Sequence, residues 1–172
     1  VGLILDGKLY KGLRGFSGEL GHMTIEKDGK RCRCGNQGCW ELYASQKVLM
    51  EQAKKLGYQE VSLDQLLKAA DNGDAGVIQL FERLGDYLGI GITNIIHIFN
   101  PGQVIIGNAL QQAEKYIMPA IENRIEKNAI GFNKNDVQIN TAKLQKYSTA
   151  MGIAAFNTEH FFMTTGNNAV KS

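Results

Sequence analysis

Short apolar segments near both ends of the chain have the pattern of β-strands. Residues 1–5 and 8–10 are apolar runs joined by Asp6-Gly7, a dipeptide typical of two-residue hairpin turns. Residues 103–107 (QVIIG) are short, apolar and β-branched, which indicates a buried strand. Over residues 137–142 apolar and polar positions alternate, as in a strand that is covered on one face.

The middle of the chain has helical periodicity. Apolar residues recur every three or four positions between residues 77 and 99, and Asp74 precedes them as an N-cap, so this is the longest expected element. Ser45 is a suitable N-cap for a helix that Gly57 ends. A capping box, Ser62-Leu-Asp-Gln65, begins a helix that runs to about residue 70. Two later helices are expected. One begins at Asn108-Ala-Leu-Gln111, which has the spacing of a second capping box, and runs to about residue 127; the other begins at Ser148.

Strands and helices alternate in the C-terminal half, which implies a partly parallel sheet with helices packed on it. In the N-terminal part, closely spaced glycines predict a loop over residues 12–21, and residues 22–27 have the pattern of a third short strand. Glycines also interrupt the long helix, where we expect close packing against another element; they are Gly85, Gly89 and Gly91. The fold class is therefore a mixed α/β lobe.

The residues best suited to chemistry gather between positions 18 and 41. All three cysteines lie there with the spacing C-x-C-x4-C, and a histidine lies ten residues before the first of them. Three thiolates and one imidazole form a complete tetrahedral set for zinc, and a site closed by protein ligands alone is structural. Polar residues separate the cysteines, which argues against three cysteines buried as small hydrophobic side chains. The expected ligands are His22, Cys32, Cys34 and Cys39.

Composition narrows the function classes. The net charge of +2 in 172 residues gives no indication of a nucleic-acid or membrane surface, and no apolar run is long enough to span a bilayer. The sequence has no signal-peptide pattern, and cysteines with metal spacing fit a reducing compartment, so we expect a cytoplasmic protein. Because the chain begins within an apolar segment and without Met, we expect it to be part of a longer protein.

Two carboxylates flank the predicted metal ligands. Glu19 lies three residues before His22, and Glu41 lies two residues after Cys39. A metal would draw these segments together and would leave one nitrogen of the His22 ring free to donate a hydrogen bond. Two acceptors beside one donor suit the adjacent hydroxyls of a sugar. From the residues alone, exposed loop charge and support of the zinc site remain alternative roles for the two carboxylates.

Several of these segments resemble the ROK family of repressors, open reading frames and sugar kinases. The similar segments are GFSGELGHMTI, CRCGNQGCWE with the following YAS, NPGQVIIGNAL and STAMGIAAF. The resemblance implies the C-terminal lobe of an actin-like ATPase fold over residues 1–160, with the zinc loop over 22–41. From the composition of its polar end, TTGNNAVKS, we expect a mobile tail over residues 161–172. An N-terminal lobe and any DNA-binding head would lie outside the chain.

The resemblance also implies roles for individual residues. It places zinc on the four ligands above, sugar contacts on Glu19, His22 and Glu41, and the nucleotide side of the cleft on Gly107, Asn108 and Ala109. Kinases of the family carry a run of glycines at the nucleotide side, so the Asn and Ala side chains argue against ATP binding. The kinases' D-x-G-x-T turn and catalytic Asp have no counterpart here, so no catalytic residue is expected.

Three functions remain open at this point. The motif sequences most resemble those of sugar-responsive, xylose-type repressors. This implies a sugar-sensing effector lobe with a structural zinc. Such a protein would contact DNA only through a head outside the chain. The alternative is the C-terminal lobe of an ATP-dependent, glucokinase-like sugar kinase that uses ATP and Mg²⁺, and the third function is a zinc-stabilised scaffold. We expect a homo-oligomer, a dimer or higher, with the long helix over 74–99 and the final helix as candidate interfaces, and no membrane partner.

Overall fold

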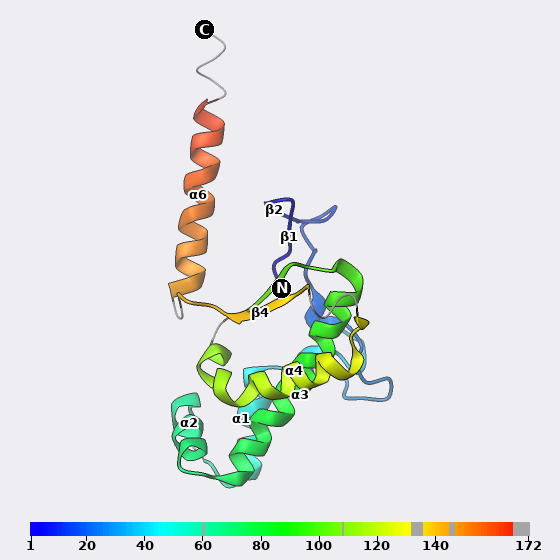
Figure 1. The fold of residues 1–172 in the computed structure, drawn as a ribbon, viewed down its shortest axis with the longest axis vertical. Helices are drawn as coiled ribbons and strands as arrows, with labels where there is room; N and C mark the ends of the chain where they lie inside the picture. Colours follow the sequence, from blue (N-terminus) through cyan, green and yellow to red (C-terminus); the bar gives the residue numbers. More distant parts are fainter. Residues whose placement is uncertain (60, 108, 132–135, 145–146, 167–172) are drawn as a thin grey trace.

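The computed structural model describes residues 1–59, 61–107, 109–131, 136–144 and 147–166 (Figure 1). The N-terminal part contains a hairpin and two turns of 3₁₀-helix: β1 (Ile4–Leu5), β2 (Lys8–Leu9), η1 (Leu20–His22) and η2 (Trp40–Leu42). Three helices follow: α1 (Gln46–Lys55), α2 (Leu63–Asp71) and α3 (Ala75–Phe99). The C-terminal part contains β3 (Gln103–Ile106), η3 (Ala109–Ala113), α4 (Glu114–Asn128), β4 (Gln138–Thr141) and α6 (Ser148–Gly166).

The three caps predicted in the middle of the chain are confirmed. The Ser45 hydroxyl accepts a hydrogen bond from Val48 N at 3.4 Å at the start of α1. At the start of α2, both bonds of the capping box between Ser62 and Gln65 are present. The Asp74 carboxylate accepts from Val77 N at 3.0 Å and begins α3. Each cap supplies an acceptor to an N–H group that has no partner within its helix.

Helix α3 is the centre of the core and packs along α4, with α1 and α2 against its other surfaces. Its glycines explain the close contact, because a Cβ atom at Gly85 would lie 2.4 Å from the carbonyl oxygen of Ile117 on α4. A Cβ atom at Gly89 would lie 2.6 Å from Arg124 Cβ. Arg124 also donates two hydrogen bonds to Asp86, at 2.7 and 2.6 Å, which joins the two helices. The predicted close packing of the helical glycines is therefore confirmed.

The strands form two separate ladders in the described residues. Strands β1 and β2 are antiparallel, and Asp6 and Gly7 between them both have positive φ, as the predicted hairpin requires. Strands β3 and β4 are parallel, with Gln103 opposite Gln138, which confirms the partly parallel arrangement. The expectation that β3 is buried is wrong for one of its faces, since Ile105 is 60% exposed while Ile106 is buried.

The third short strand predicted over residues 22–27 is wrong. The segment makes only one isolated bridge, between Thr24 and Cys39. Its backbone curves around the cysteine loop, because Trp40 N donates to Met23 O and Ile25 N donates to Gly38 O. The segment therefore follows the loop that it supports rather than an extended ladder.

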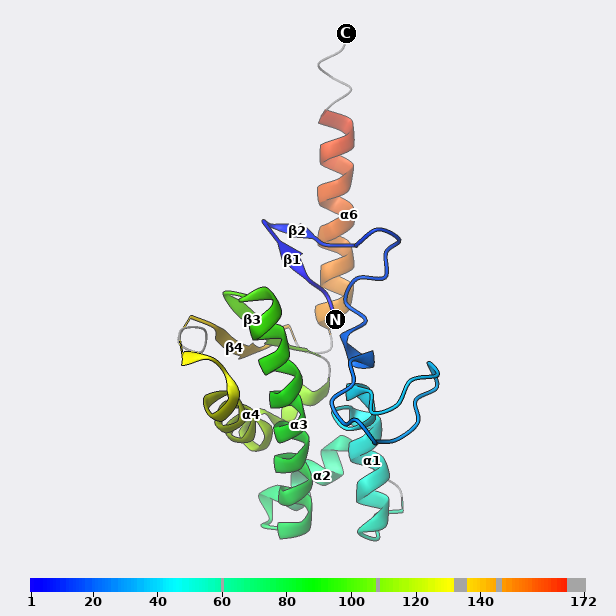
Figure 2. The ribbon, with the colours of Figure 1, turned by 90° about the vertical axis from the view of Figure 1, so that its right-hand side faces the viewer.

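The last third of the chain differs in detail from the prediction. The helix expected over 108–127 begins as the 3₁₀ segment η3 and becomes α-helical at Glu114, and its expected cap at Asn108 lies outside the described residues. Helix α6 extends away from the helical body in both views (Figures 1 and 2). It runs to Gly166, so the first part of the tail expected from residue 161 is helical, and residues 167–172 lie outside the described residues. None of the described helices is long and apolar enough to cross a membrane.

Candidate metal centre and its carboxylate neighbours

The cysteine loop, residues 22–41, folds back on itself through local hydrogen bonds. Cys32 N donates to Asn36 O at 2.8 Å, and Gly35 N donates to Cys32 O at 3.0 Å. Gly38 has a φ of 74°, and a Cβ atom there would lie 1.7 Å from Glu26 O, so this position requires glycine. This tight turn brings Cys39 back towards Cys32 and Cys34.

The four predicted metal ligands are brought together. Their ligand atoms, one from each of His22, Cys32, Cys34 and Cys39, all lie within 4.8 Å of one another. Cys34 Sγ lies 3.6 Å from Cys39 Sγ, and Cys32 Sγ lies 3.7 Å from His22 Nδ1. Tetrahedral zinc with ordinary bond lengths separates its ligand atoms by about 3.6–3.8 Å. The two shorter pairs already match that geometry, so the donor set fits a closed, structural zinc site.

Burial distinguishes the cysteines. Cys39 is fully buried and Cys32 is nearly so, whereas Cys34 is exposed, and all three are free thiols. Burial is the main reason why the pKa of Cys39 is raised to about 12. Without a metal, Cys39 is therefore a neutral thiol, and ligation there releases a proton.

His22 has one carboxylate near each of its two ring nitrogens. Its Nδ1 atom faces Cys32, while its Nε2 atom lies 3.8 Å from Glu19 Oε2. Glu41 Oε1 lies 3.7 Å from His22 Nδ1 and accepts a hydrogen bond from the Cys32 thiol at 3.3 Å. Metal ligation through Nδ1 would leave the proton on Nε2, which is the donor that the sequence predicted. Since a thiolate has no proton to donate, ligation at Cys32 also leaves both oxygens of Glu41 as acceptors.

Trp40 fixes the part of the loop that carries Glu41. Its indole Nε1 donates to Tyr87 O on α3 at 2.7 Å, and its ring lies against Gly91 so closely that a Cβ atom there would come within 2.0 Å of it. The cysteine loop lies beside α1 and α3 in Figure 2. Because Trp40 separates Cys39 from Glu41, helix α3 positions the metal ligand on one side and the carboxylate on the other. The sequence showed a single tryptophan beside a predicted ligand, but its role depends on a contact with a distant helix.

Three polar side chains that the sequence did not single out brace the loop. Asn36 Nδ2 donates to Thr24 Oγ1 at 3.0 Å, and Gln37 Nε2 donates to Gly29 O at 2.8 Å. The Tyr43 hydroxyl accepts a hydrogen bond from Lys30 N at 2.8 Å. These contacts hold the loop in place from residues that have no special spacing in the sequence.

The structure describes only two of the three residues that were predicted to lie at the nucleotide side. Gly107 follows β3 and is half-buried, Ala109 begins η3, and Asn108 lies outside the described residues. A Cβ atom at Gly107 would meet nothing within 4 Å. The assignment of these three residues to a nucleotide site stays a prediction.

Comparison with known proteins identifies the family of this chain. The model of the ROK family matches residues 1–160. The chain belongs to the ROK family. The xylose repressor of Bacillus subtilis (strain 168) is 36% identical over 165 residues, which cover 94% of this chain and 42% of that protein. The DNA-binding transcriptional dual regulator NagC of Escherichia coli (strain K12) is 33% identical over 164 residues, which cover 90% of this chain and 40% of that protein.

Solved structures of both ROK regulators and ROK kinases have this fold. A ROK family transcriptional regulator described as a homolog of the E. coli MLC protein has a TM-score of 0.75 and 33% identity, over 81% of this chain and 38% of that one. A ROK family glucokinase from Streptomyces griseus, in complex with glucose and AMPPNP, has a TM-score of 0.74 and 29% identity, over 85% of this chain and 53% of that one. The predicted actin-like ATPase fold is confirmed, and the chain spans about two fifths of the length of the curated relatives above.

Proposed function

We propose that this chain is the sugar-sensing effector lobe of a ROK-family transcriptional repressor. The observation that carries the proposal is the placement of Glu19 and Glu41 around the ring of His22, beside a cluster that fits zinc. The curated relatives described above, which are 33–36% identical, are transcription regulators, and one of them is named for xylose.

The chemistry of the site suits a polyhydroxylated ligand. Zinc, as the structural cofactor, would hold His22 through Nδ1, so that Nε2 donates a hydrogen bond to a ligand hydroxyl. Glu19 and Glu41 then accept hydrogen bonds from neighbouring hydroxyls, which are stronger than neutral bonds because the acceptor is charged. Four protein ligands would leave no open position on a bound zinc ion, so the site would bind and orient a ligand rather than hydrolyse it.

Regulation would follow from differential affinity. A sugar can shift the protein between two arrangements only if it binds one of them more tightly, and the change would reach DNA through a part of the protein outside residues 1–172. In this proposal the repressor acts in the cytoplasm as a homo-oligomer. Much of α3, one of its two candidate interface helices, already packs within the chain, which leaves α6 as the stronger candidate.

The alternative function is the C-terminal lobe of an ATP-dependent sugar kinase. The similarity to a glucokinase that holds glucose and AMPPNP favours it. That function would require a nucleotide beside Gly107, Asn108 and Ala109, with Mg²⁺, and a catalytic base from another part of the protein.

Calorimetry on the full-length protein, with a panel of pentoses and hexoses that includes xylose, tests the proposal. One sugar should bind without ATP turnover, and Glu41→Gln should weaken its binding by about tenfold or more while the zinc content stays unchanged. Glu122→Gln, an exposed substitution on α4, is the matched control and should leave the affinity unchanged. Sugar-dependent production of ADP would refute the repressor function in favour of the kinase, and an unchanged affinity in Glu41→Gln would refute the assigned contact.

A further inference from the structure

A small cavity opens between the cysteine loop, α1 and α3. Its volume is about 260 Å³. The bottom is apolar and includes Leu49 and Leu84 of the core. Tyr43 and Tyr87 form its aromatic wall, with ring centroids 5.0 Å apart and planes inclined by 35°. We call this cavity the Tyr43–Tyr87 pocket, and none of Glu19, His22 and Glu41 lines it.

The charges at its rim are all of one sign. Three cations line the pocket and no carboxylate does so among the described residues: Lys30, Lys55 and Arg83. Lys55 and Arg83 form no ion pair or hydrogen bond with any residue that the structure describes. Two of the three cations therefore have no partner among the described residues, and cations around a concave apolar surface attract an anionic group.

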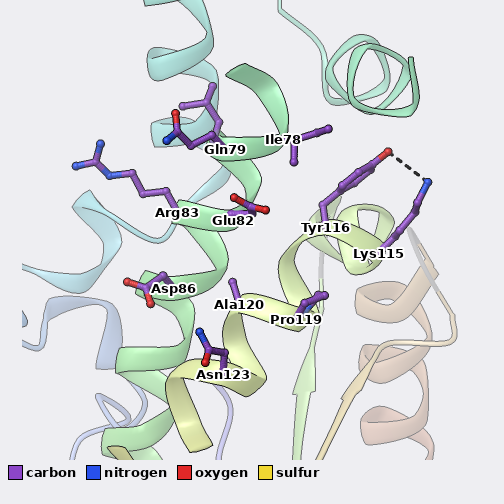
Figure 3. A pocket seen from close by; sticks show the side chains of 11 residues that line it. Ile78, Gln79, Glu82, Arg83, Asp86, Lys115, Tyr116, Pro119, Ala120 and Asn123 are labelled. Carbon is purple, nitrogen blue, oxygen red and sulfur yellow. Dashed lines mark hydrogen bonds between the residues drawn. The ribbon is translucent and has the colours of Figure 1, made fainter. Parts of the chain in front are cut away.

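A neighbouring cavity has a different charge pattern. That cavity, of about 680 Å³, lies between α3 and α4 (Figure 3). The lining of that cavity carries charges of both signs: Glu82, Asp86, Arg83 and Lys115. Two of these charges already have partners, since Asp86 pairs with Arg124 and Lys115 pairs with Asp71. Figure 3 shows Arg83 extending away from Lys115 and Tyr116, so its guanidinium is not part of their cluster.

The pocket is also held in shape before anything binds. The backbone N–H of Lys30 donates to the Tyr43 hydroxyl at 2.8 Å, and Lys30 Nζ donates to Leu42 O at 3.4 Å. Lys30 Nζ also lies 5.2 Å from the centre of the Tyr43 ring. These contacts fix one cation and one aromatic wall together, so a ligand loses less affinity to ordering the site.

We propose that the Tyr43–Tyr87 pocket binds a small organic anion with a flat, apolar body. The anionic head would lie among Lys30, Lys55 and Arg83, and the body would lie against the two tyrosine rings. A volume of about 260 Å³ is below the roughly 300–1,000 Å³ of most drug-sized ligand sites, which favours a molecule of the size of an aryl phosphate or an aryl carboxylate. Such a site is separate from the proposed sugar contacts and does not depend on them.

Titrations followed by tyrosine-ring NMR signals on the full-length protein test the site. The probes are phenyl phosphate and benzoate, with benzyl alcohol as the neutral counterpart and inorganic phosphate as the anion without a body. At least one aryl anion should bind with a dissociation constant of about 1 mM or tighter and shift the signals of Tyr43 and Tyr87. Benzyl alcohol and inorganic phosphate should each bind at least about tenfold more weakly, and the preferred aryl anion identifies the head group.

Two variants and a matched control locate the binding. Arg83→Gln should weaken the binding of the aryl anion by about tenfold or more, and Lys55→Gln serves as the second variant if the first does not fold. Lys54→Gln, an exposed neighbour on α1 that does not line the pocket, should leave the affinity unchanged. Equal affinity in the Lys54 and Arg83 variants would overturn the proposal. The absence of saturable binding of both aryl anions would also overturn the proposal. If, in addition, Arg83→Gln changed the sedimentation of the protein, the cations would serve a contact between chains instead.

Discussion

Substitution of Gly91 by alanine tests whether α3 holds the cysteine loop in place. The added methyl carbon would lie 2.0 Å from Trp40 Cε2 and 2.2 Å from Cζ2, whereas carbon atoms in contact are separated by about 3.5–4.0 Å. The indole would therefore have to move by more than 1 Å. That movement would break or lengthen the hydrogen bond of 2.7 Å from Trp40 Nε1 to Tyr87 O.

The expected loss in the free energy of unfolding is about 2 kcal/mol. Overfilling a packed core costs roughly 1–3 kcal/mol, and the loss of one hydrogen bond costs about 0.5–1.5 kcal/mol. Alanine in a helix interior is favoured over glycine by about 1 kcal/mol, which offsets part of the cost. For a chain of this size, a loss of 2 kcal/mol lowers Tm by about 4–8 °C.

Urea unfolding followed by far-UV circular dichroism measures this loss without using the fluorescence of Trp40. Gly152→Ala is the matched control, because a Cβ atom at Gly152 on α6 meets no described atom within 4 Å. It should leave the free energy of unfolding unchanged or raise it by up to about 1 kcal/mol. In a Trp40→Phe background the smaller ring makes room for the methyl group, so Gly91→Ala should cost at least about 1 kcal/mol less there.

A Gly91→Ala protein as stable as the parent would refute the reasoning. The contact between Trp40 and Gly91 would then not constrain the loop. A full loss in the Trp40→Phe background would also contradict it, because the cost would come from some other part of α3.

The remaining predictions concern the metal and the response to acid. The purified protein should hold about one zinc per chain, and Cys34→Ser should lower both zinc content and Tm; a variant with the zinc and stability of the parent would refute the site. Two hydrogen bonds hold the pKa of Asp74 below its usual value. The larger effect comes from the Tyr58 hydroxyl and the smaller one from Val77 N–H. The stability that Asp74 contributes is therefore complete above the unfolded pKa, about 3.9, and is lost as the pH falls through the lower folded value. Asp74→Asn should flatten the pH dependence of unfolding between about pH 2 and 5, and an unchanged slope would contradict this assignment.

The sequence by itself determined most local elements and the four candidate metal ligands. Caps such as Ser62 with Gln65 act over three residues, so their geometry follows from the helix that they begin. The hairpin at Asp6-Gly7 is equally local. The metal site in the cysteine loop could be predicted because its four candidate ligands lie within eighteen residues, from His22 to Cys39. A combination of one histidine and three cysteines at this spacing is also rare outside metal sites.

Tertiary structure decided what the sequence left open or predicted wrongly. Residues 22–27 have a strand pattern, yet hydrogen bonds to Gly38 and Trp40 curve them around the loop. Tyr43 and Tyr87 are far apart in the chain and meet only because α1 and α3 pack beside the cysteine loop. Trp40 likewise acquires its role from Gly91: the sequence predicted close packing at this glycine, but only the fold shows that Trp40 is the residue packed there. Contacts of this kind depend on which elements become neighbours, and that choice is made by burial of the whole apolar surface rather than by spacing along the chain.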